Sequence, residues 1–287
     1  MTAFKALYQT SKNYIINKPA FYLPENLYVK YIVFISTLIS FLSHSKIRTY
    51  SKIAVEKFPQ YFIHKITVGN QQIMFQNGFR ISRFIRGFDF AGERMWRRYK
   101  IDEILGSDIP EAILDVGANI GEFSYFASIK FSGLSKIISV EPDPVVLKCI
   151  EFNLKETEIN IEPIAVSDKS AVLKFYLKPT SADSSFHIPS GDAVEIEVAA
   201  RTLDSVIEKY NLSGPILVKM DCEGHEPEAL EGLMRNKDKI KWISIDSGPE
   251  RSGVSTTREV ISKLRQHGFE NITTHGFNIV TAVKRSS

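Results

Sequence analysis

The chain has 287 residues, which is long enough for one large α/β domain, or for one domain with an accessory segment, around a substantial buried core. Its 36 basic and 33 acidic side chains leave a formal net charge of only +3. Because the dense Lys/Arg stripe that phosphate backbones require is missing, nucleic acid is excluded as the expected partner.

Cysteine usage and the first residues indicate the compartment. Cys149 and Cys222 are too few for a disulfide framework, and no Cys-x-x-Cys pair indicates zinc. Residues 1–26 carry scattered lysines and no continuous apolar core, so we expect no cleavable signal peptide. Together these features predict a cytoplasmic protein.

The N-terminal segment, residues 1–58, contains one apolar stretch. Residues 27–43, "LYVKYIVFISTLISFLS", are predicted to form a helix with an apolar face. A membrane span needs about 20 apolar residues, and this stretch falls short of that. It fits a helix packed against protein, a helix at a membrane interface or a true span. Because basic residues follow it, contact with an anionic membrane surface through residues 27–43 stays open.

The next segment, residues 59–110, is predicted to be a hairpin and a helical lead-in. Apolar and polar residues alternate around a Gly-Asn turn, which indicates two strands at residues 62–68 and 71–76. The stretch "RFIRGFDFAGERMWRRYKIDEIL" then predicts a loop and a helix. Within it, "MWRRY" fits packing and the protein surface better than a substrate platform, although its position before the first core strand would let it fold over a bound ligand.

Residues 111–287 are predicted to form the main domain. Apolar strands alternate with helices in a way that indicates a doubly wound, mostly parallel sheet. After the first unit, strands are expected in "KIISVEP", "INIEPIAVSD", "GPILVKMDCEG" and "IKWISID", with strand pieces inserted in "AVLKFYLKP" and "AVEIEVAARTL". Helices are expected in "PVVLKCIEFNLKET", from Glu226 and in "TTREVISKLRQHGF", and "ENITTHG" and "FNIVTAVKR" are expected to close the sheet as an antiparallel pair.

The stretch "ILDVGANIGEFSYFA" predicts a strand, a tight turn and a helix, and ligands of open α/β sheets bind beyond such strand ends. Gly117 permits close backbone approach or a positive φ, Gly121 lets the helix pack closely on its strand, and Asn119 offers hydrogen bonds. The third glycine of a dinucleotide fingerprint is missing. Asp115 would repel a pyrophosphate but suits an ammonium or a sulfonium cation.

A second carboxylate ends the following strand, where "VEPDP" places Glu141 twenty residues after Gly121. A carboxylate at this position can accept hydrogen bonds from both hydroxyls of a ribose. Taken alone, Asp115 or Glu141 fits an ordinary cap or turn residue as well as a ligand-binding one. In consecutive strand–turn–helix units, the pair predicts a nucleoside ligand.

These motifs, together with "IAVSD", "TLDSV" and "VKMDCEGHEPEALEGL", resemble in order those of FkbM-type S-adenosylmethionine-dependent methyltransferases, which act chiefly as O-methyltransferases. The resemblance spans about residues 113–245. It implies the class I methyltransferase fold, a Rossmann-like α/β sheet of seven mostly parallel strands, here with an N-terminal helical and hairpin extension.

The resemblance also implies S-adenosylmethionine as cofactor. Asp115, Gly117 and the turn to Gly121 would surround its methionine moiety, and Glu141 would bind its ribose. Asp168 would lie near the adenine amine, although it equally fits an ordinary turn residue. The family usually has Glu where this chain has Asp246, which leaves a role there open.

Groups that can act in catalysis gather at the end of the fourth strand, in "KMDCEGHE". Methyl transfer to a hydroxyl needs an aligned acceptor and removal of a proton. Asp221 and Glu223 can orient the acceptor and activate its hydroxyl, or bind a divalent metal, or Glu223 and Glu226 can serve as acids at the start of the next helix. His225 has the most suitable intrinsic pKa for a base, or it is a solvent-facing residue at the helix start.

We therefore predict Asp221, Glu223 and His225 as catalytic residues. A divalent metal is compatible with this cluster but is not favoured, and no metal ligand is assigned. The expected activity is O-methylation of a glycan, glycolipid or related small-molecule acceptor, where the acceptor class comes from the resemblance alone. The alternatives are an NAD-type oxidoreductase and a non-catalytic adenosyl-binding module.

Overall fold

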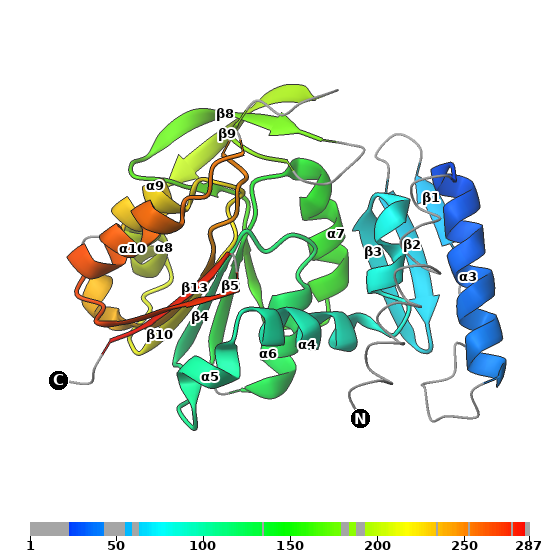
Figure 1. The fold of residues 1–287 in the computed structure, drawn as a ribbon, viewed down its shortest axis with the longest axis horizontal. Coiled ribbons are helices and arrows are strands. Elements are labelled where there is room, and N and C mark those ends of the chain that lie inside the picture. The colour runs from blue at the N-terminus through cyan, green and yellow to red at the C-terminus, as the bar shows by residue number, and fades with distance from the viewer. Residues whose placement is uncertain are drawn as a thin grey trace. The chain divides into compact units, whose positions relative to one another are not determined.

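A computed structural model describes residues 23–42, 55–58, 63–133, 135–178, 184–187, 193–233, 235–251, 253–276 and 278–284. The chain divides into two compact units, residues 1–90 and 91–287 (Figure 1). The division into three segments that the sequence suggested stays a prediction.

The first unit combines one long helix with a small antiparallel sheet. It contains α3 (Glu25–Leu42), β1 (Val55–Phe58), β2 (Ile63–Val68), β3 (Gln71–Gln76) and the 3-10 helix η3 (Gly78–Arg83), with the strands in the order β1-β2-β3. Val68 pairs with Gln71 across the Gly-Asn turn, so the predicted hairpin is confirmed from Ile63 onward. Phe62, its predicted first residue, lies outside the described residues.

Helix α3 occupies the stretch expected to be helical, apart from Ser43, which lies outside the described residues. Tyr28, Val29 and Ile32 are buried, whereas Phe34 is 64% exposed. Among the helices that the structure describes, none is long and apolar enough to cross a membrane.

The second unit carries the large sheet and its helices, and the boundary between the two units falls within its first helix, at residues 90 and 91. The unit continues from α4 (Phe88–Arg98) through α5 (Ile101–Leu105), β4 (Ala112–Val116), α6 (Glu122–Lys130), β5 (Lys136–Val140), α7 (Pro144–Leu154), β6 (Asn160–Glu162), β7 (Ala165–Val166), β8 (Ala171–Leu177), β9 (Val194–Arg201), α8 (Leu203–Lys209), β10 (Ile216–Met220), α9 (Glu226–Glu231), η4 (Lys237–Lys239), β11 (Ile240–Asp246), α10 (Thr257–Gln266) and β12 (Asn271–His275) to β13 (Ile279–Val283).

The central sheet has seven strands in the order β12-β13-β11-β10-β4-β5-β6. The strands from β11 to β6 run parallel, and β13 pairs antiparallel with both β11 and β12. The predicted class I methyltransferase fold and the closing antiparallel pair are therefore confirmed. Strand order reverses between β4 and β10, which makes the carboxyl ends of these two strands the expected ligand position.

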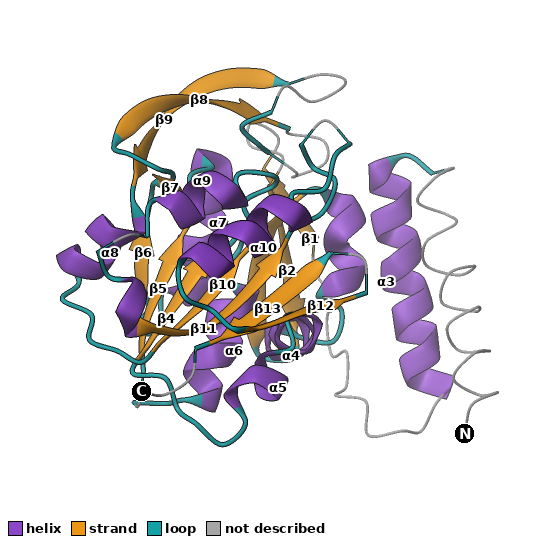
Figure 2. Ribbon diagram, turned by 60° about the vertical axis from the view of Figure 1, so that its left-hand side comes forward, coloured by secondary structure: helices purple, strands orange, loops and turns teal. Residues whose placement is uncertain are grey.

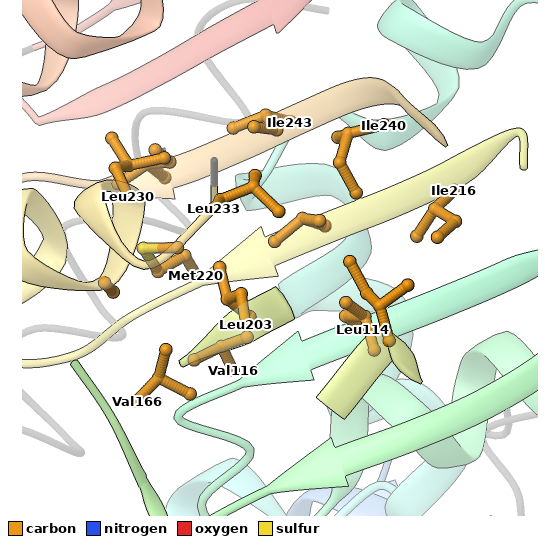
Figure 3. Close-up of a cluster of buried hydrophobic side chains, with 14 of the residues drawn as sticks. Leu114, Val116, Val166, Leu203, Ile216, Met220, Leu230, Leu233, Ile240 and Ile243 are labelled. Carbon is orange, nitrogen blue, oxygen red and sulfur yellow. The ribbon is translucent and has the colours of Figure 1, made fainter. Parts of the chain in front are cut away.

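Both faces of the sheet are covered, which explains why β4 is buried along its whole length. Leu114 and Val116 pack into one core with residues of α8 to α10, and Figure 3 shows part of it. Ile113 points to the opposite core, where it lies with Trp96 and Phe123. Figure 1 accordingly shows α8, α9 and α10 on one side of the sheet and α6 and α7 on the other.

One predicted strand is divided in two. The stretch "INIEPIAVSD" was expected to form a single third strand, but β6 ends at Glu162 and β7 begins at Ala165. Pro163 separates them, because it has no N–H to donate to a strand partner. Only β6 joins the central sheet, and β7 joins β9 and β8 in a second sheet. Figures 1 and 2 both place β8 and β9 at one end of the central sheet.

Candidate active site

The turn after β4 has left-handed backbone at three positions: φ is +70° at Gly117, +50° at Asn119 and +89° at Gly121. A Cβ on Gly117 would lie 1.8 Å from the carbonyl oxygen of Asp221, so the backbone beyond β4 touches the backbone beyond β10. A Cβ on Gly121 would lie 2.9 Å from side chains of α7. The close approach expected at Gly121 is thus made to α7 rather than to its own strand.

Asp115 lies directly beneath this turn and is completely buried. Its Oδ1 is 3.0 Å from Nζ of Lys219, which is also buried, and its Oδ2 accepts a 2.7 Å hydrogen bond from Ser124. Burial opposes the charge on Lys219, but the negative charges of Asp115 and Asp221 raise the pKa of its ammonium group. Lys219 also donates to the carbonyl oxygen of Gly117 at 2.8 Å. The Asp115 carboxylate therefore faces partners of its own chain and supports the turn from below.

Glu141 follows β5 and borders the same turn. Its Oε2 accepts a 2.9 Å hydrogen bond from the N–H of Asn119, and its Oε1 accepts a 3.0 Å hydrogen bond from the N–H of Asp143. Burial, reinforced by the charge of Asp143, raises the pKa of Glu141 to about 8. A carboxylate has about four acceptor positions, so both oxygens retain capacity for further donors.

Asp143 connects this carboxylate to α7. Its Oδ1 accepts hydrogen bonds from the N–H groups of Val145 and Val146, and Pro144 occupies the first turn, which together start the helix. Its Oδ2 accepts a 2.7 Å hydrogen bond from Ser184. The cap therefore holds the backbone that binds Glu141.

A second group of acids lies at the ends of β10 and β11. Asp221 follows β10, and its Oδ2 accepts a 2.6 Å hydrogen bond from the hydroxyl of Tyr99. Asp246 ends β11, is 3% exposed and forms an ion pair with Arg98 through Oδ2. Its Oδ1 is buried and has no hydrogen-bond partner among the described residues. Burial and the charge of Asp221 raise the pKa of Asp246, against the effect of Arg98.

Glu250 is the third acid of this group and lies four residues beyond Asp246. Its Oε2 is also buried and lacks a hydrogen-bond partner within the described part of the chain. A Cβ on Gly248 would lie 2.1 Å from its Oε1, so the side chain folds back over that glycine. Burial, with the charges of Asp246 and Asp221, raises the pKa of Glu250.

Arg98 and Tyr99 were missed by sequence reasoning, which assigned "MWRRY" to packing and surface. The packing prediction is confirmed for Trp96, which stacks on Phe123, and for Tyr99, which is fully buried in the same core. In addition, Ser244 of β11 donates a 2.6 Å hydrogen bond to the carbonyl oxygen of Tyr99. Burial raises the pKa of the Tyr99 phenol well above its ordinary value, so it stays protonated and donates to Asp221. Since Tyr99 and Asp221 are 122 residues apart, no local signal reveals the pair.

The loop after Asp221 is held by Glu226. Glu223 and Gly224 have φ values of +52° and +94°. Oε1 of Glu226 accepts hydrogen bonds of 3.0 Å from the N–H groups of Cys222 and Gly224, and its Oε2 accepts one from Thr256. Burial raises the pKa of Glu226 to about 7. Glu226 thus lies in the first turn of α9 and holds the loop that precedes the helix.

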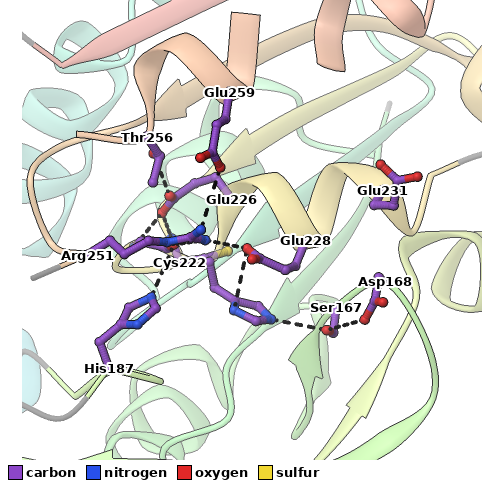
Figure 4. A network of polar contacts seen from close by, with 12 residues as sticks. Ser167, Asp168, His187, Cys222, Glu226, Glu228, Glu231, Arg251, Thr256 and Glu259 are labelled. Atoms are coloured by element: carbon purple, nitrogen blue, oxygen red, sulfur yellow. Dashed lines mark hydrogen bonds and ion pairs between the residues drawn. The ribbon is translucent and has the colours of Figure 1, made fainter. Parts of the chain in front are cut away.

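Arg251 holds the same loop from the other side, as Figure 4 shows. Its Nε and one terminal nitrogen donate to the carbonyl oxygen of Gly224 at 2.9 and 2.6 Å, and it pairs with Glu228 of α9. The loop that carries Glu223 therefore has a defined backbone path.

His225 contacts other residues than Asp221 does. Its Nε2 lies 3.1 Å from Oγ of Ser167, its Nδ1 lies 3.7 Å from Glu228, and its ring centroid is 4.5 Å from that of Phe186. Burial lowers the pKa of the imidazole. Asp168 is exposed and accepts a 3.1 Å hydrogen bond from Ser167, so Asp168 and His225 meet through Ser167.

The structure brings most of the predicted residues to one edge of the sheet. Five surround the turn beyond β4 and β5, namely Asp115, Gly117, Asn119, Gly121 and Glu141, and three follow β10, namely Asp221, Glu223 and His225. In the described part of the chain, no group of three or more His, Cys, Asp or Glu side chains is arranged to hold a metal ion.

Comparison with known proteins identifies similar sequences. The profile of the "Methyltransferase FkbM domain" family matches residues 115–270. "Hexuronic acid methyltransferase AglP" of Haloferax volcanii is 24% identical over 160 residues, which cover 55% of this chain and 63% of that protein. "31-O-demethyl-FK506 methyltransferase FkbM" of Streptomyces tacrolimicus is 24% identical over 192 residues, which cover 55% and 72%. The chain thus spans less than two thirds of the length of AglP.

Solved structures show weaker similarity. A precorrin-6y C5,15-methyltransferase from Geobacter metallireducens is 15% identical with a TM-score of 0.39, over 66% of this chain and 89% of that one. The METTL16 methyltransferase domain is 10% identical with a TM-score of 0.41, over 67% and 68%.

Proposed function

The chain belongs to the FkbM methyltransferase domain family, and on this premise we propose that it uses S-adenosylmethionine to methylate a hydroxyl group. The proposed acceptor is a glycan, a glycolipid or a related metabolite. Methyl transfer from a sulfonium to an oxygen needs a bound cofactor, an aligned acceptor and a group that removes the hydroxyl proton.

The residues at the ends of β4 and β5 fit the cofactor. Glu141 presents two oxygens that each accept only one hydrogen bond from the backbone, which leaves positions for the two hydroxyls of a ribose. Gly117 and Gly121 keep the turn free of side chains, and the Asp115–Lys219 pair supports it. When bound, S-adenosylmethionine supplies an electrophilic methyl group on a positively charged sulfur.

The single observation that carries the proposal is the acidic group at the ends of β10 and β11, next to this turn. Asp221, Asp246 and Glu250 place three carboxyl groups there, with Arg98 and Lys219 as cations nearby. An excess of carboxylates attracts a sulfonium and can accept a proton from a hydroxyl.

We also propose that Asp221, Glu223 and His225 are catalytic residues, as the sequence predicts. Asp221 is the best placed of the three, because it follows β10, touches the Gly117 turn through its backbone and is oriented by Tyr99. We assign it the role of orienting the acceptor. Asp168, at the end of β7, is proposed to lie near the adenine.

The acceptor class rests on the relatives. One is named for a hexuronic acid, which is a sugar, and another for a 31-O-demethyl compound, which implies transfer to oxygen. Among the alternatives, an NAD-type oxidoreductase is not favoured, because these relatives are named as methyltransferases. A non-catalytic adenosyl-binding module would bind the cofactor without turnover.

Contact with a membrane surface through residues 27–43 is a second, separate proposal. Within α3, Leu27 is 46% and Phe34 64% exposed, which leaves apolar surface for a lipid interface. Co-sedimentation of the full chain with anionic phospholipid vesicles tests it, with a Phe34→Glu variant expected to sediment less. Equal sedimentation of both proteins would contradict it.

The main test is methyl transfer from labelled S-adenosylmethionine to two probe acceptors, a p-nitrophenyl glycoside of a hexuronic acid and one of a neutral hexose. We expect label in at least one glycoside, and calorimetric binding of S-adenosylmethionine but not NAD. The Glu141→Ala variant should bind the cofactor more weakly, whereas Glu156→Gln, at a position 87% exposed, should bind it like the wild type. Binding of NAD alone would contradict the proposal, and cofactor binding without transfer to either glycoside or to fractionated cell extract would favour the non-catalytic alternative.

A further inference from the structure

Two carboxyl oxygens near the proposed acceptor position are buried without a hydrogen-bond partner among the described residues. They are Oδ1 of Asp246, on a side chain that is 3% exposed, and Oε2 of Glu250. Native proteins rarely leave buried polar atoms unsatisfied, and each such atom calls for an explanation, of which a catalytic role is one. Oδ1 of Asp115 also lacks a hydrogen bond among the described residues, but the ammonium group of Lys219 lies 3.0 Å from it. The donors missing at Asp246 and Glu250 can come from an acceptor that carries hydroxyl groups.

The other candidate bases of this region already have partners. Asp221 accepts a 2.6 Å hydrogen bond from Tyr99. Both oxygens of Glu226 accept hydrogen bonds, from the backbone of its own loop and from Thr256. Both ring nitrogens of His225 face protein groups, Ser167 and Glu228.

Glu250 has the surroundings of a carboxylate that binds a proton readily. It lies in the turn beyond β11, within range of the charges of Asp246, Asp221 and Arg98. Burial and the two aspartates raise its pKa, whereas a hydrogen bond from its own backbone N–H and the charge of Arg98 act in the opposite direction. A general base works best when its pKa approaches the working pH, so these neighbours make Glu250 a stronger base than an exposed glutamate.

We propose that Glu250 is the general base of the methyl transfer. Its Oε2 receives the proton of the acceptor hydroxyl while the hydroxyl oxygen forms a bond to the methyl carbon. The bond from that carbon to sulfur breaks, its electron pair stays on sulfur, and the proton later passes from Glu250 to water. Asp246 is a positioning residue, because Arg98 holds one of its oxygens and its charge keeps Glu250 basic. This inference rests on the proposed function.

The first test compares turnover of the wild-type protein and Glu250→Gln on whichever p-nitrophenyl glycoside the wild type methylates faster. We expect kcat to fall about 100-fold or more, with the affinity for S-adenosylmethionine unchanged. In the wild type, kcat should rise with pH through the pKa of Glu250, because only the carboxylate accepts a proton, and this limb should disappear in Glu250→Gln. Formate should partly restore turnover to Glu250→Ala.

A second variant moves the carboxylate without removing it. The φ of Gly248 is not positive, and the atoms nearest to an added Cβ belong to the flexible end of Glu250. Gly248→Ala should therefore fold normally, displace the carboxylate and lower kcat at least tenfold. Glu156→Gln, which removes an exposed glutamate elsewhere, serves as the matched control.

A third measurement does not depend on turnover. In a 13C NMR titration of the glutamate carboxyl groups, Glu250→Gln should remove one signal with a raised pKa, and Asp246→Asn should shift that pKa downward. Two results would overturn the inference. One is that Glu250→Gln keeps kcat within threefold of the wild type and kcat still rises with pH as in the wild type. The other is that the spectrum of Glu250→Gln still contains every glutamate signal that has a raised pKa in the wild type. If the wild-type protein turns over in either case, only the role of Glu250 is rejected and the proposed function stands. If the wild-type protein shows no turnover, the proposed function and the role of Glu250 are both rejected.

Discussion

The carboxyl groups beyond β4 and β5 differ from those beyond β10 and β11 in how completely the protein satisfies them. Asp115 has a lysine and a serine as partners, and Glu141 binds two backbone N–H groups. Asp246 and Glu250 each keep a buried oxygen without a partner among the described residues. Oδ1 of Asp115 accepts no hydrogen bond among the described residues either, but it lies 3.0 Å from the ammonium nitrogen of Lys219. The first pair of carboxylates is thus held by cations and donors of the chain, whereas Asp246 and Glu250 each keep one buried oxygen without a hydrogen bond in the described part of the chain.

The proposed cofactor half of the site lies beyond β4 and β5, and the proposed acceptor half lies beyond β10 and β11. The proposed cofactor half needs a fixed turn, so its polar groups contribute to folding as well as to binding. The proposed acceptor half needs oxygens that are free to receive donors, and each unsatisfied buried group costs about 1–3 kcal/mol of stability. Substitutions in the first half should therefore destabilise the protein, and substitutions in the second half should mainly lower turnover.

The largest effect is expected for Lys219→Met. This variant leaves Asp115 buried without a cation, which should lower the free energy of unfolding by about 3–5 kcal/mol. Urea denaturation followed by circular dichroism measures it. The double variant Asp115→Asn with Lys219→Met should recover much of the loss, because the uncompensated charge is gone. A loss below about 1 kcal/mol in the single variant would show that the pair does not support the fold.

Glu141→Ala should have the next largest effect, on cofactor affinity. Loss of hydrogen bonds to a charged group costs about 1.5–3 kcal/mol, which corresponds to roughly 10- to 100-fold weaker binding of S-adenosylmethionine. Isothermal titration calorimetry measures the dissociation constant, with Glu156→Gln as the control. Unchanged affinity would remove Glu141 from the cofactor site.

A smaller effect is expected from pH on the same binding. The raised pKa of Glu141, about 8, means that the unliganded carboxyl group is mostly protonated at pH 7. Ribose hydroxyls donate better to the ionised form, so affinity should increase as the pH rises toward 8 and level off above it, by up to about tenfold per pH unit. In Glu141→Gln, the affinity for S-adenosylmethionine should not change with pH between pH 6.5 and 9. If it still increases with pH in this variant, another group causes the effect.

The smallest effect on stability is expected for Asp246→Asn. The variant removes an ion pair whose Arg98 partner is 51% exposed, and burial and the charge of Asp221 already oppose ionisation of Asp246, so the free energy of unfolding should change by no more than about 1 kcal/mol. Turnover should fall nonetheless. Urea denaturation of Asp246→Asn and Lys219→Met side by side measures the difference. An equal loss of stability in both variants would show that the cofactor half does not contribute more to folding than the acceptor half.

Much of the fold could be predicted from local patterns. Apolar runs bounded by turns identified the strands of the central sheet, and alternation around Gly-Asn identified the hairpin of β2 and β3. The division at Pro163 was missed, because the apolar residues on both sides of the proline continue the pattern of one strand. Within the site, the glycine turn and the acids at strand ends were predictable, since strand ends and turns are local features.

Local sequence patterns are enough to set the order of strand, turn and helix units, and so to place Asp115, Glu141 and Asp221 at strand ends, because hydrophobic periodicity and turn residues act within a few positions. The partners of these acids depend on contacts between distant parts of the chain. Lys219 reaches the Gly117 carbonyl across 102 residues, and Arg98 reaches Asp246 across 148. Such contacts follow from which strands lie side by side, and that arrangement is set by packing of the whole sheet rather than by any local stretch.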